Sequence, residues 1–136
     1  MSTEARFYCG LTLVLVPTIV YGGLTVLGAL SGGRYGAPAP PGLTAQQVTF
    51  YRAGHAHAGV LALLALFIQM AIDQASLPLS LVTPLRIAAL AAPILVSGGF
   101  FGLAHFPPLR ALLYLGAATL AVTTLTVGVG LMKAGR

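Results

Sequence analysis

Four long apolar stretches constrain this chain more than any other feature. They cover residues of about 7–31, 53–72, 86–105 and 109–132. Each reaches the roughly 20 residues that an α-helix needs to cross the hydrocarbon core of a bilayer. Only 7% of the residues are charged, against about 25% in soluble domains, so the chain cannot cover itself with a hydrated surface. The sequence therefore predicts an all-α integral membrane protein, a four-helix antiparallel bundle that forms one domain over residues 1–136.

The N-terminal stretch is expected to remain as the first span. Its apolar run is too long for the apolar region of a signal peptide, and no small-residue cleavage site followed by a soluble domain is evident. The single cysteine, Cys9, cannot form a disulfide within the chain. We interpret it as a small apolar residue near the start of a helix.

One long connection separates the first two spans. Residues 32–50 contain a segment rich in Gly and Pro that cannot be helical, and we expect an external loop there. Thr44 is a candidate N-cap for a short helical lead into the second span. Connections of this length are uncommon in compact bundles and are often functional, although a plain spacer between spans is the favoured interpretation.

Small and polar residues predict which face of each span points into the bundle, because membrane helices associate through small residues and interhelical hydrogen bonds. Residues three and four apart share a helical face. The predicted inward faces are Gly10, Val14, Pro17, Tyr21, Thr25 and Gly28 in the first span; His55, Ala58, Ala62, Ala65, Gln69 and Asp73 in the second; Gly98, Gly102 and His105 in the third; and Tyr114, Ala117, Ala121, Thr124 and Gly128 in the fourth. The opposite face of the second span is predicted to meet lipid and comprises His57, Val60, Leu61, Leu64 and Ile68.

An even number of spans places both termini on one side of the membrane. The basic residues of the terminal side are Arg6, Arg86, Lys133 and Arg136, and those of the other side are Arg34, Arg52 and Arg110. This excess favours cytoplasmic termini by the positive-inside rule. We expect the protein in a bacterial inner (plasma) membrane.

All three histidines are predicted to lie at one level, near the external face. His55 and His57 begin the second span and His105 ends the third, with Tyr51 and Arg52 beside them. Ionisable side chains inside a membrane are costly and mark functional sites, and imidazole is the commonest metal ligand. On a regular helix His57 points about 200° away from His55. One metal ion therefore reaches both rings only if the backbone is irregular there.

Haem b is the first chemistry that this cluster fits. His55 and His105 would be the axial ligands, and small residues around them would leave room for the macrocycle. Arg52 and Arg110 would pair with the propionates, and Tyr51 would lie nearby.

Two further chemistries fit the same residues. A zinc or copper ion would take His55, His57 and His105 as ligands, with an irregular turn at Gly54. Alternatively, the histidines would titrate or bind an anionic headgroup beside the arginines, without any metal. Carboxylate–histidine catalysis is disfavoured, because the two carboxylates of the chain fall at the opposite end.

The segment from Tyr51 to Leu61, YRAGHAHAGVL, resembles the histidine-bearing helix starts of small four-span bacterial membrane proteins of unassigned function. It is also similar to haem-ligating helix segments of haem–copper oxidases and nitric-oxide-related membrane proteins. The likeness covers about a dozen residues. It implies that the histidines in this segment ligate haem or copper.

These observations predict a small membrane protein that binds haem b or a transition metal at its external end, in electron transfer, sensing or respiratory-complex assembly. The alternatives are an accessory or structural membrane subunit, and a membrane-embedded enzyme or transporter acting on a lipophilic or ionic substrate. Whether any reaction is catalysed is left open. The predicted partners are the lipid bilayer and either copies of the chain or a larger membrane complex. Nucleic acid is excluded, because the basic residues form no stripe with interleaved aromatics.

Overall fold

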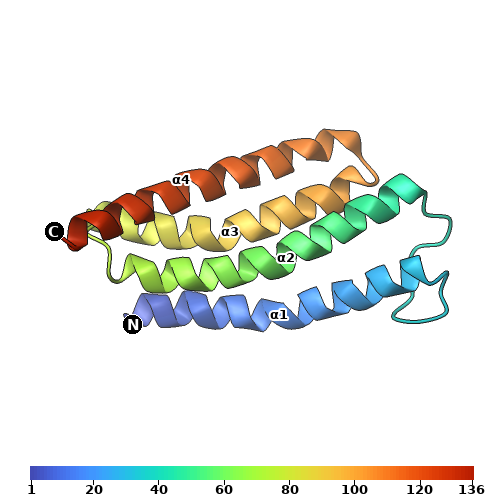
Figure 1. Cartoon of the computed structure of the whole chain (residues 1–136), viewed down its shortest axis with the longest axis horizontal. Coiled ribbons are helices and arrows are strands. Elements are labelled where there is room, and N and C mark those ends of the chain that lie inside the picture. The colour runs from blue at the N-terminus through green and yellow to red at the C-terminus, as the bar shows by residue number, and fades with distance from the viewer.

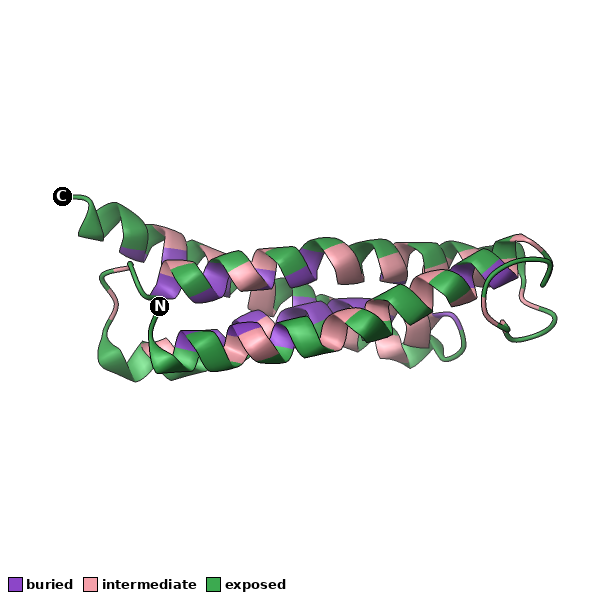
Figure 2. Ribbon diagram, turned by 90° about the horizontal axis from the view of Figure 1, so that it is seen from below, coloured by how far each residue is buried: buried purple, intermediate pink, exposed green.

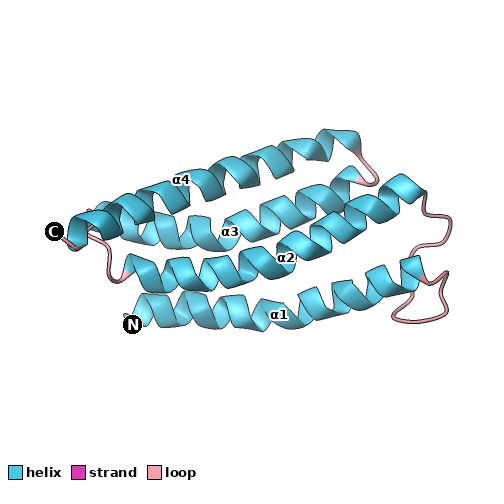
Figure 3. Ribbon diagram, viewed as in Figure 1, coloured by secondary structure: helices cyan, strands magenta, loops and turns pink.

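The computed structural model describes all residues of the chain, and every regular element in it is helical (Figure 3). The elements are α1 (Thr3–Leu30), α2 (Ala45–Ile72), α3 (Leu79–Leu103), the short 3-10 helix η1 (Pro107–Leu109) and α4 (Arg110–Ala134). The four long helices lie side by side and alternate in direction, so both termini lie at one end (Figure 1). The prediction of an antiparallel four-helix bundle is confirmed.

Each long helix has the length and composition of a membrane span. α1 and α2 have 28 residues each, and at 1.5 Å per residue they measure about 42 Å. This exceeds the roughly 30 Å of a bilayer's hydrocarbon core. The chain is therefore a membrane protein, and its outer apolar surface is suited to lipid.

The helices pack in chain order. α1 contacts mainly α2, α4 contacts mainly α3, and α1 does not contact α4 at all. Buried residues lie between the helices while exposed residues cover their outer sides (Figure 2). The apolar core joins α2, α3 and α4 near the end that carries the termini, and it consists of Ile68, Ile72, Leu85, Ala89 and Val127. α1 is the least enclosed helix of the bundle.

Two glycines bring α3 and α4 close together. A Cβ atom added at Gly99 would lie 2.6 Å from the backbone nitrogen of Leu113, and one added at Gly116 would lie 2.7 Å from that of Val96. Only glycine leaves room for backbones at this separation. Gly98 and Gly102 were the glycines of the third span predicted to pack closely. Gly102 does lie against Leu109, but a Cβ added at Gly98 meets nothing within 4 Å, and the neighbouring Gly99 makes the contact with α4.

The loop between α1 and α2 folds back over the end of α1. The backbone N–H of Ala37 donates to the carbonyl of Leu24 at 3.0 Å. Gly36 has φ +80° and lies against the same turn, a conformation that favours glycine. The predicted cap is present, since Thr44 and Gln47 form a capping box. Gln47 Nε2 also donates to the Ala104 carbonyl at 3.0 Å, which ties the start of α2 to the end of α3.

The predicted inward face of α2 is confirmed over most of its length, because Ala62, Ala65 and Gln69 are buried. Its opposite face was predicted to meet lipid, and this is wrong for Leu61 and Ile68, which are also buried. The reason is that α2 has neighbours on two sides, α1 and α3.

The predicted inward faces of α1 and α4 are wrong for every residue but Gly28, which is buried as expected. Tyr21 is 60% exposed and Tyr114 is 68% exposed. The other buried residues are Ala5, Cys9, Thr12 and Val26 on α1, and Gly116, Thr123, Val127 and Gly130 on α4. Hydroxyl groups did not identify the interior, because the threonines donate to carbonyls of their own helices and need no partner from another helix.

Replacing Gly99 with Ala is expected to lower the stability of the bundle by about 1–3 kcal/mol, because the added methyl meets backbone atoms that cannot move aside. Thermal melting in detergent measures the loss. Gly128→Ala is the matched control on α4, since a Cβ there meets nothing within 4 Å. Equal melting temperatures for the two variants would contradict the close packing of α3 on α4.

Candidate functional site

The three histidines have different surroundings. The ring of His105 lies at the exposed end of α3, with Nε2 2.7 Å from the Tyr51 hydroxyl. The ring of His57 bonds the carbonyl of Ala53 through Nδ1 at 2.7 Å and lies over Phe100. The ring of His55 lies against α1. Unlike the other two rings, it forms no hydrogen bond within the chain.

The chain does not bring these histidines together as a metal-ligand set. No group of three or more His, Cys, Asp or Glu side chains is arranged to hold a metal ion. His55, His57 and His105 therefore do not form a three-histidine site within one chain. Tyr51 does meet His105 as expected, whereas Arg52 and Arg110 are exposed and form no ion pair.

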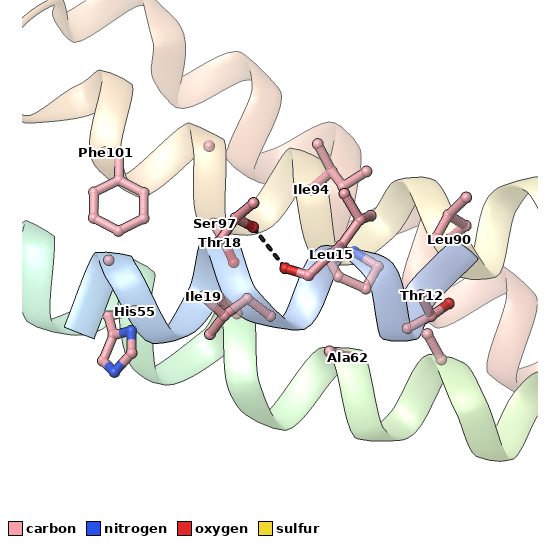
Figure 4. Close-up of a pocket in the computed structure, with 15 residues that line it drawn as sticks. Thr12, Leu15, Thr18, Ile19, His55, Ala62, Leu90, Ile94, Ser97 and Phe101 are labelled. Carbon is pink, nitrogen blue, oxygen red and sulfur yellow. Dashed lines mark hydrogen bonds between the residues drawn. The ribbon is translucent and has the colours of Figure 1, made fainter. Parts of the chain in front are cut away.

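His55 belongs to a pocket between α1, α2 and α3 that the sequence did not reveal. The pocket has a volume of about 340 Å³, within the usual range for small-molecule sites. It is called the α1–α3 pocket below, and ten of the residues that line it are labelled in Figure 4. Its 15 lining residues are Thr12, Leu15, Thr18, Ile19, Gly22, His55, Ala58, Ala62, Ala65, Leu90, Pro93, Ile94, Ser97, Gly98 and Phe101.

Small residues create the space. Ala58, Ala62 and Ala65 line the α2 wall with single methyl groups, and Gly98 leaves the α3 wall open. α1 and α3 also make few contacts across the pocket. The small face of α2, interpreted from the sequence as a helix-packing face, is thus in part the wall of a cavity.

Most polar groups of the pocket are already satisfied by the backbone. Thr18 Oγ1 donates to the Leu15 carbonyl at 2.6 Å, the bond drawn dashed in Figure 4. Thr12 Oγ1 donates to the Tyr8 carbonyl at 2.8 Å. Ser97 is the exception, because its Oγ is buried and has no hydrogen-bonding partner. The groups free to bond a ligand are therefore Ser97 Oγ and the ring nitrogens of His55.

A second polar cluster lies one helical turn beyond the other end of the pocket. Its centre is Arg86, which is 1% exposed. Nη1 of Arg86 donates to the carbonyl of Gln69 at 2.9 Å and to its Oε1 at 3.2 Å, while Gln69 Nε2 donates back to the Arg86 carbonyl at 2.9 Å. Nη2 donates to Asp73 Oδ1 and to Ser2 Oγ. Nε makes no hydrogen bond but lies 3.3 Å from Glu4 Oε2.

This cluster fastens the start of α1 to α2 and α3. Ser2 donates to both carboxylate oxygens of Asp73, through its N–H and its hydroxyl. Thr83 Oγ1 donates to Glu4 Oε1 at 3.3 Å. Burial opposes ionisation of Asp73, but the hydrogen bonds from Ser2 and Arg86, together with the charge of Arg86, lower the pKa of this carboxyl below its ordinary value.

The sequence indicated Arg86 only as one of the basic residues on the terminal side, and the buried cluster was not predicted. The available signal was the short connection between the second and third spans. Asp73 ends α2 shortly before that connection and Arg86 follows it in α3, so antiparallel helices bring the two residues to the same level. Gln69 and Asp73 had already been assigned to the inward face of α2.

No family model matches the chain, and no curated protein or solved structure is significantly similar to it. The likeness of the segment from Tyr51 to Leu61 to haem-ligating helices therefore stays a prediction.

Replacing Arg86 with Met is expected to destabilise the bundle by about 3–5 kcal/mol, because Asp73 is then left without its buried cation. Thermal melting in detergent measures the loss. Arg110→Met is the matched control, since Arg110 is exposed and forms no ion pair. The double variant Arg86→Met with Asp73→Asn should melt above the single Arg86→Met variant. A double variant that is no more stable would contradict this role for the ion pair.

The lowered pKa of Asp73 makes stability depend on pH. The stabilisation is present above the pKa of Asp73 in the unfolded chain and is lost as pH falls through the lower pKa of the folded protein. The melting temperature should therefore fall below about pH 4, since an unperturbed Asp titrates near 3.9. Asp73→Asn should flatten this decline. An unchanged decline in the variant would assign the acid sensitivity to other groups.

Proposed function

We propose that this chain is an integral membrane protein that binds a lipophilic small molecule within the bilayer, in the α1–α3 pocket. The observation that carries the proposal is the pocket itself, an open cavity of about 340 Å³ formed between three spans and lined mainly by apolar side chains and small residues. A water-soluble ligand would have little to bond there, because Ser97 and His55 are the polar groups left free. This function is related to one alternative from the sequence, a membrane-embedded enzyme or transporter acting on a lipophilic or ionic substrate, but it concerns binding only.

The surroundings of the pocket support entry from the lipid. α1 packs mainly against α2 and makes few contacts with α3. It is held at one end by the polar cluster around Arg86 and at the other by His55, whose ring lies against Gly22 and Gly23. A small separation of α1 from α3 would open the pocket sideways without breaking the core formed by α2, α3 and α4.

A haem or transition-metal function is the second candidate, and the free ring of His55 favours it. This ring lines the pocket and is not engaged by another group, so it is available as an axial ligand. A further ligand would have to be His105 after release from Tyr51, or a histidine of another copy of the chain. Electron transfer, sensing or respiratory-complex assembly would be the corresponding roles.

The placement in the cell and in a complex is part of the same proposal. We assign the protein to a bacterial inner membrane with cytoplasmic termini, because basic residues are in excess at the terminal end. Small residues on the exposed face of α4, such as Ala117 and Ala121, support association with another copy or with a larger membrane complex.

Filling the pocket is expected to abolish ligand binding while leaving the fold intact. Gly98→Leu places a side chain in the cavity from a position where a Cβ meets nothing within 4 Å. The measurement is extraction and mass spectrometry of lipophilic molecules that copurify with the protein in mild detergent. Molecules bound in the pocket should be at least about tenfold depleted from the variant, a change of roughly 1.4 kcal/mol in binding.

Gly128→Leu is the matched control, because it adds the same side chain on α4, also in open space and outside the pocket. Equal recovery of every copurifying molecule from Gly98→Leu and Gly128→Leu would refute the pocket as a binding site. The absorption spectrum and metal content of the same samples test the second candidate. A Soret band or stoichiometric copper, zinc or iron that disappears in His55→Ala would support it, and the absence of both would remove it.

A further inference from the structure

Ser97 has a buried hydroxyl group without a partner. The residue is 7% exposed and lines the α1–α3 pocket, and its Oγ forms no hydrogen bond. Serine and threonine in helices commonly bond a carbonyl of the preceding turn, as Thr12 and Thr18 do in the same pocket. A buried hydroxyl that remains unbonded costs free energy, so Ser97 is an exception that points to a partner outside the chain.

His55 supplies a second free polar group at a different depth. Gly54 packs against the ring of Phe101 and the Cβ of Phe100, which puts His55 near the level of Phe101. Ser97 precedes Phe101 by four residues on α3, a rise of about 6 Å. The pocket therefore presents two polar groups from two helices, about one helical turn apart in depth.

The charges around the pocket limit what can bind these two groups. His55 is the one ionisable side chain among the lining residues, so no carboxylate is present to receive a cation. Arg86 is already surrounded by Asp73 and Glu4 and is not available to an anion. The ligand is therefore neutral, and a hydroxyl group and an imidazole N–H can both bond it if it carries acceptors.

We propose that the α1–α3 pocket binds a quinone, a neutral ring with a carbonyl oxygen at each of two opposite positions. One carbonyl accepts a hydrogen bond from Ser97 Oγ and the other from a ring N–H of His55, while Phe101 contacts the ring. The apolar tail lies along Leu90 and Ile94 toward the middle of the bilayer. This inference rests on the proposed binding of a lipophilic molecule and concerns binding only, without a redox step.

The test compares two probes on the full chain in detergent, decyl-benzoquinone and decylbenzene, which share a tail and differ in the carbonyl groups. The wild-type protein should bind the quinone about tenfold more tightly. Ser97→Ala and His55→Leu should each reduce this preference about threefold, the effect of one lost hydrogen bond, so that the two bonds together account for the tenfold preference. Ser80→Ala is the matched control on α3, because Ser80 is exposed in the first turn of the helix and lies outside the pocket.

A second readout has a decisive outcome on the wild-type protein alone. The infrared carbonyl stretch of decyl-benzoquinone bound to the wild-type protein should shift to lower frequency than in empty detergent micelles, and Ser97→Ala should restore one component. An unshifted carbonyl band would overturn the quinone assignment, because it would mean that Ser97 donates no hydrogen bond to the quinone.

The outcomes separate this inference from the function on which it rests. If Gly98→Leu blocks both probes but the wild-type protein binds them equally, the pocket takes lipophilic molecules and the quinone assignment fails. The same assignment fails if Ser97→Ala keeps the full preference for the quinone. If the wild-type protein binds neither probe, or if Gly98→Leu leaves the binding of both probes unchanged, the proposed function itself fails.

Discussion

A guanidinium group cannot stay buried in an apolar bundle unless it is neutralised and hydrogen-bonded, and the arrangement of three helices depends on how Arg86 meets this condition. Arg86 belongs to α3, and the partners of its guanidinium group come from the start of α1 and the end of α2. Gln69 Nε2 donates to the carbonyl of Arg86 and Arg86 Nη1 donates to the carbonyl of Gln69, and these two bonds align α2 with α3 at this level. α1, which has the fewest other contacts, is placed by the same charge.

The pocket results from the way in which α1 is fastened to its neighbours. Because polar contacts fasten the helix near one end and His55 meets its glycines near the other, the middle of α1 need not pack closely against α3. Alanines on α2 and Gly98 on α3 leave that middle region open. The remaining wall is apolar apart from a few hydroxyls and His55, and Ser97 is the buried hydroxyl without a partner. The polar cluster around Arg86 thus lies beyond one end of the cavity, whereas the candidate binding groups Ser97 and His55 line the cavity itself.

Helix faces were predictable for α2 but not for α1 and α4. In a soluble protein, apolar residues mark the inward face because water covers the other side. In a bilayer, lipid is as apolar as the protein interior, so hydrophobicity carries no such signal and small residues are the remaining guide. That guide worked for Ala62 and Ala65, which face neighbouring helices. It failed for Tyr21 and Tyr114, because α1 and α4 each contact mainly one neighbour and expose the rest of their surface.

The sequence by itself determined four apolar spans, their antiparallel order, the common side of the termini and the collection of histidines near the opposite end. These properties depend on the length and composition of each segment and on the order of the segments along the chain. They do not depend on how one helix packs against another. The tertiary structure alone decided that Arg86 is buried among carboxylates, that Gly99 rather than Gly98 brings α3 to α4, and that His55 and Ser97 share a pocket. Each of these depends on the rotation of one helix against its neighbour, and a shift of one residue turns a side chain by about 100°.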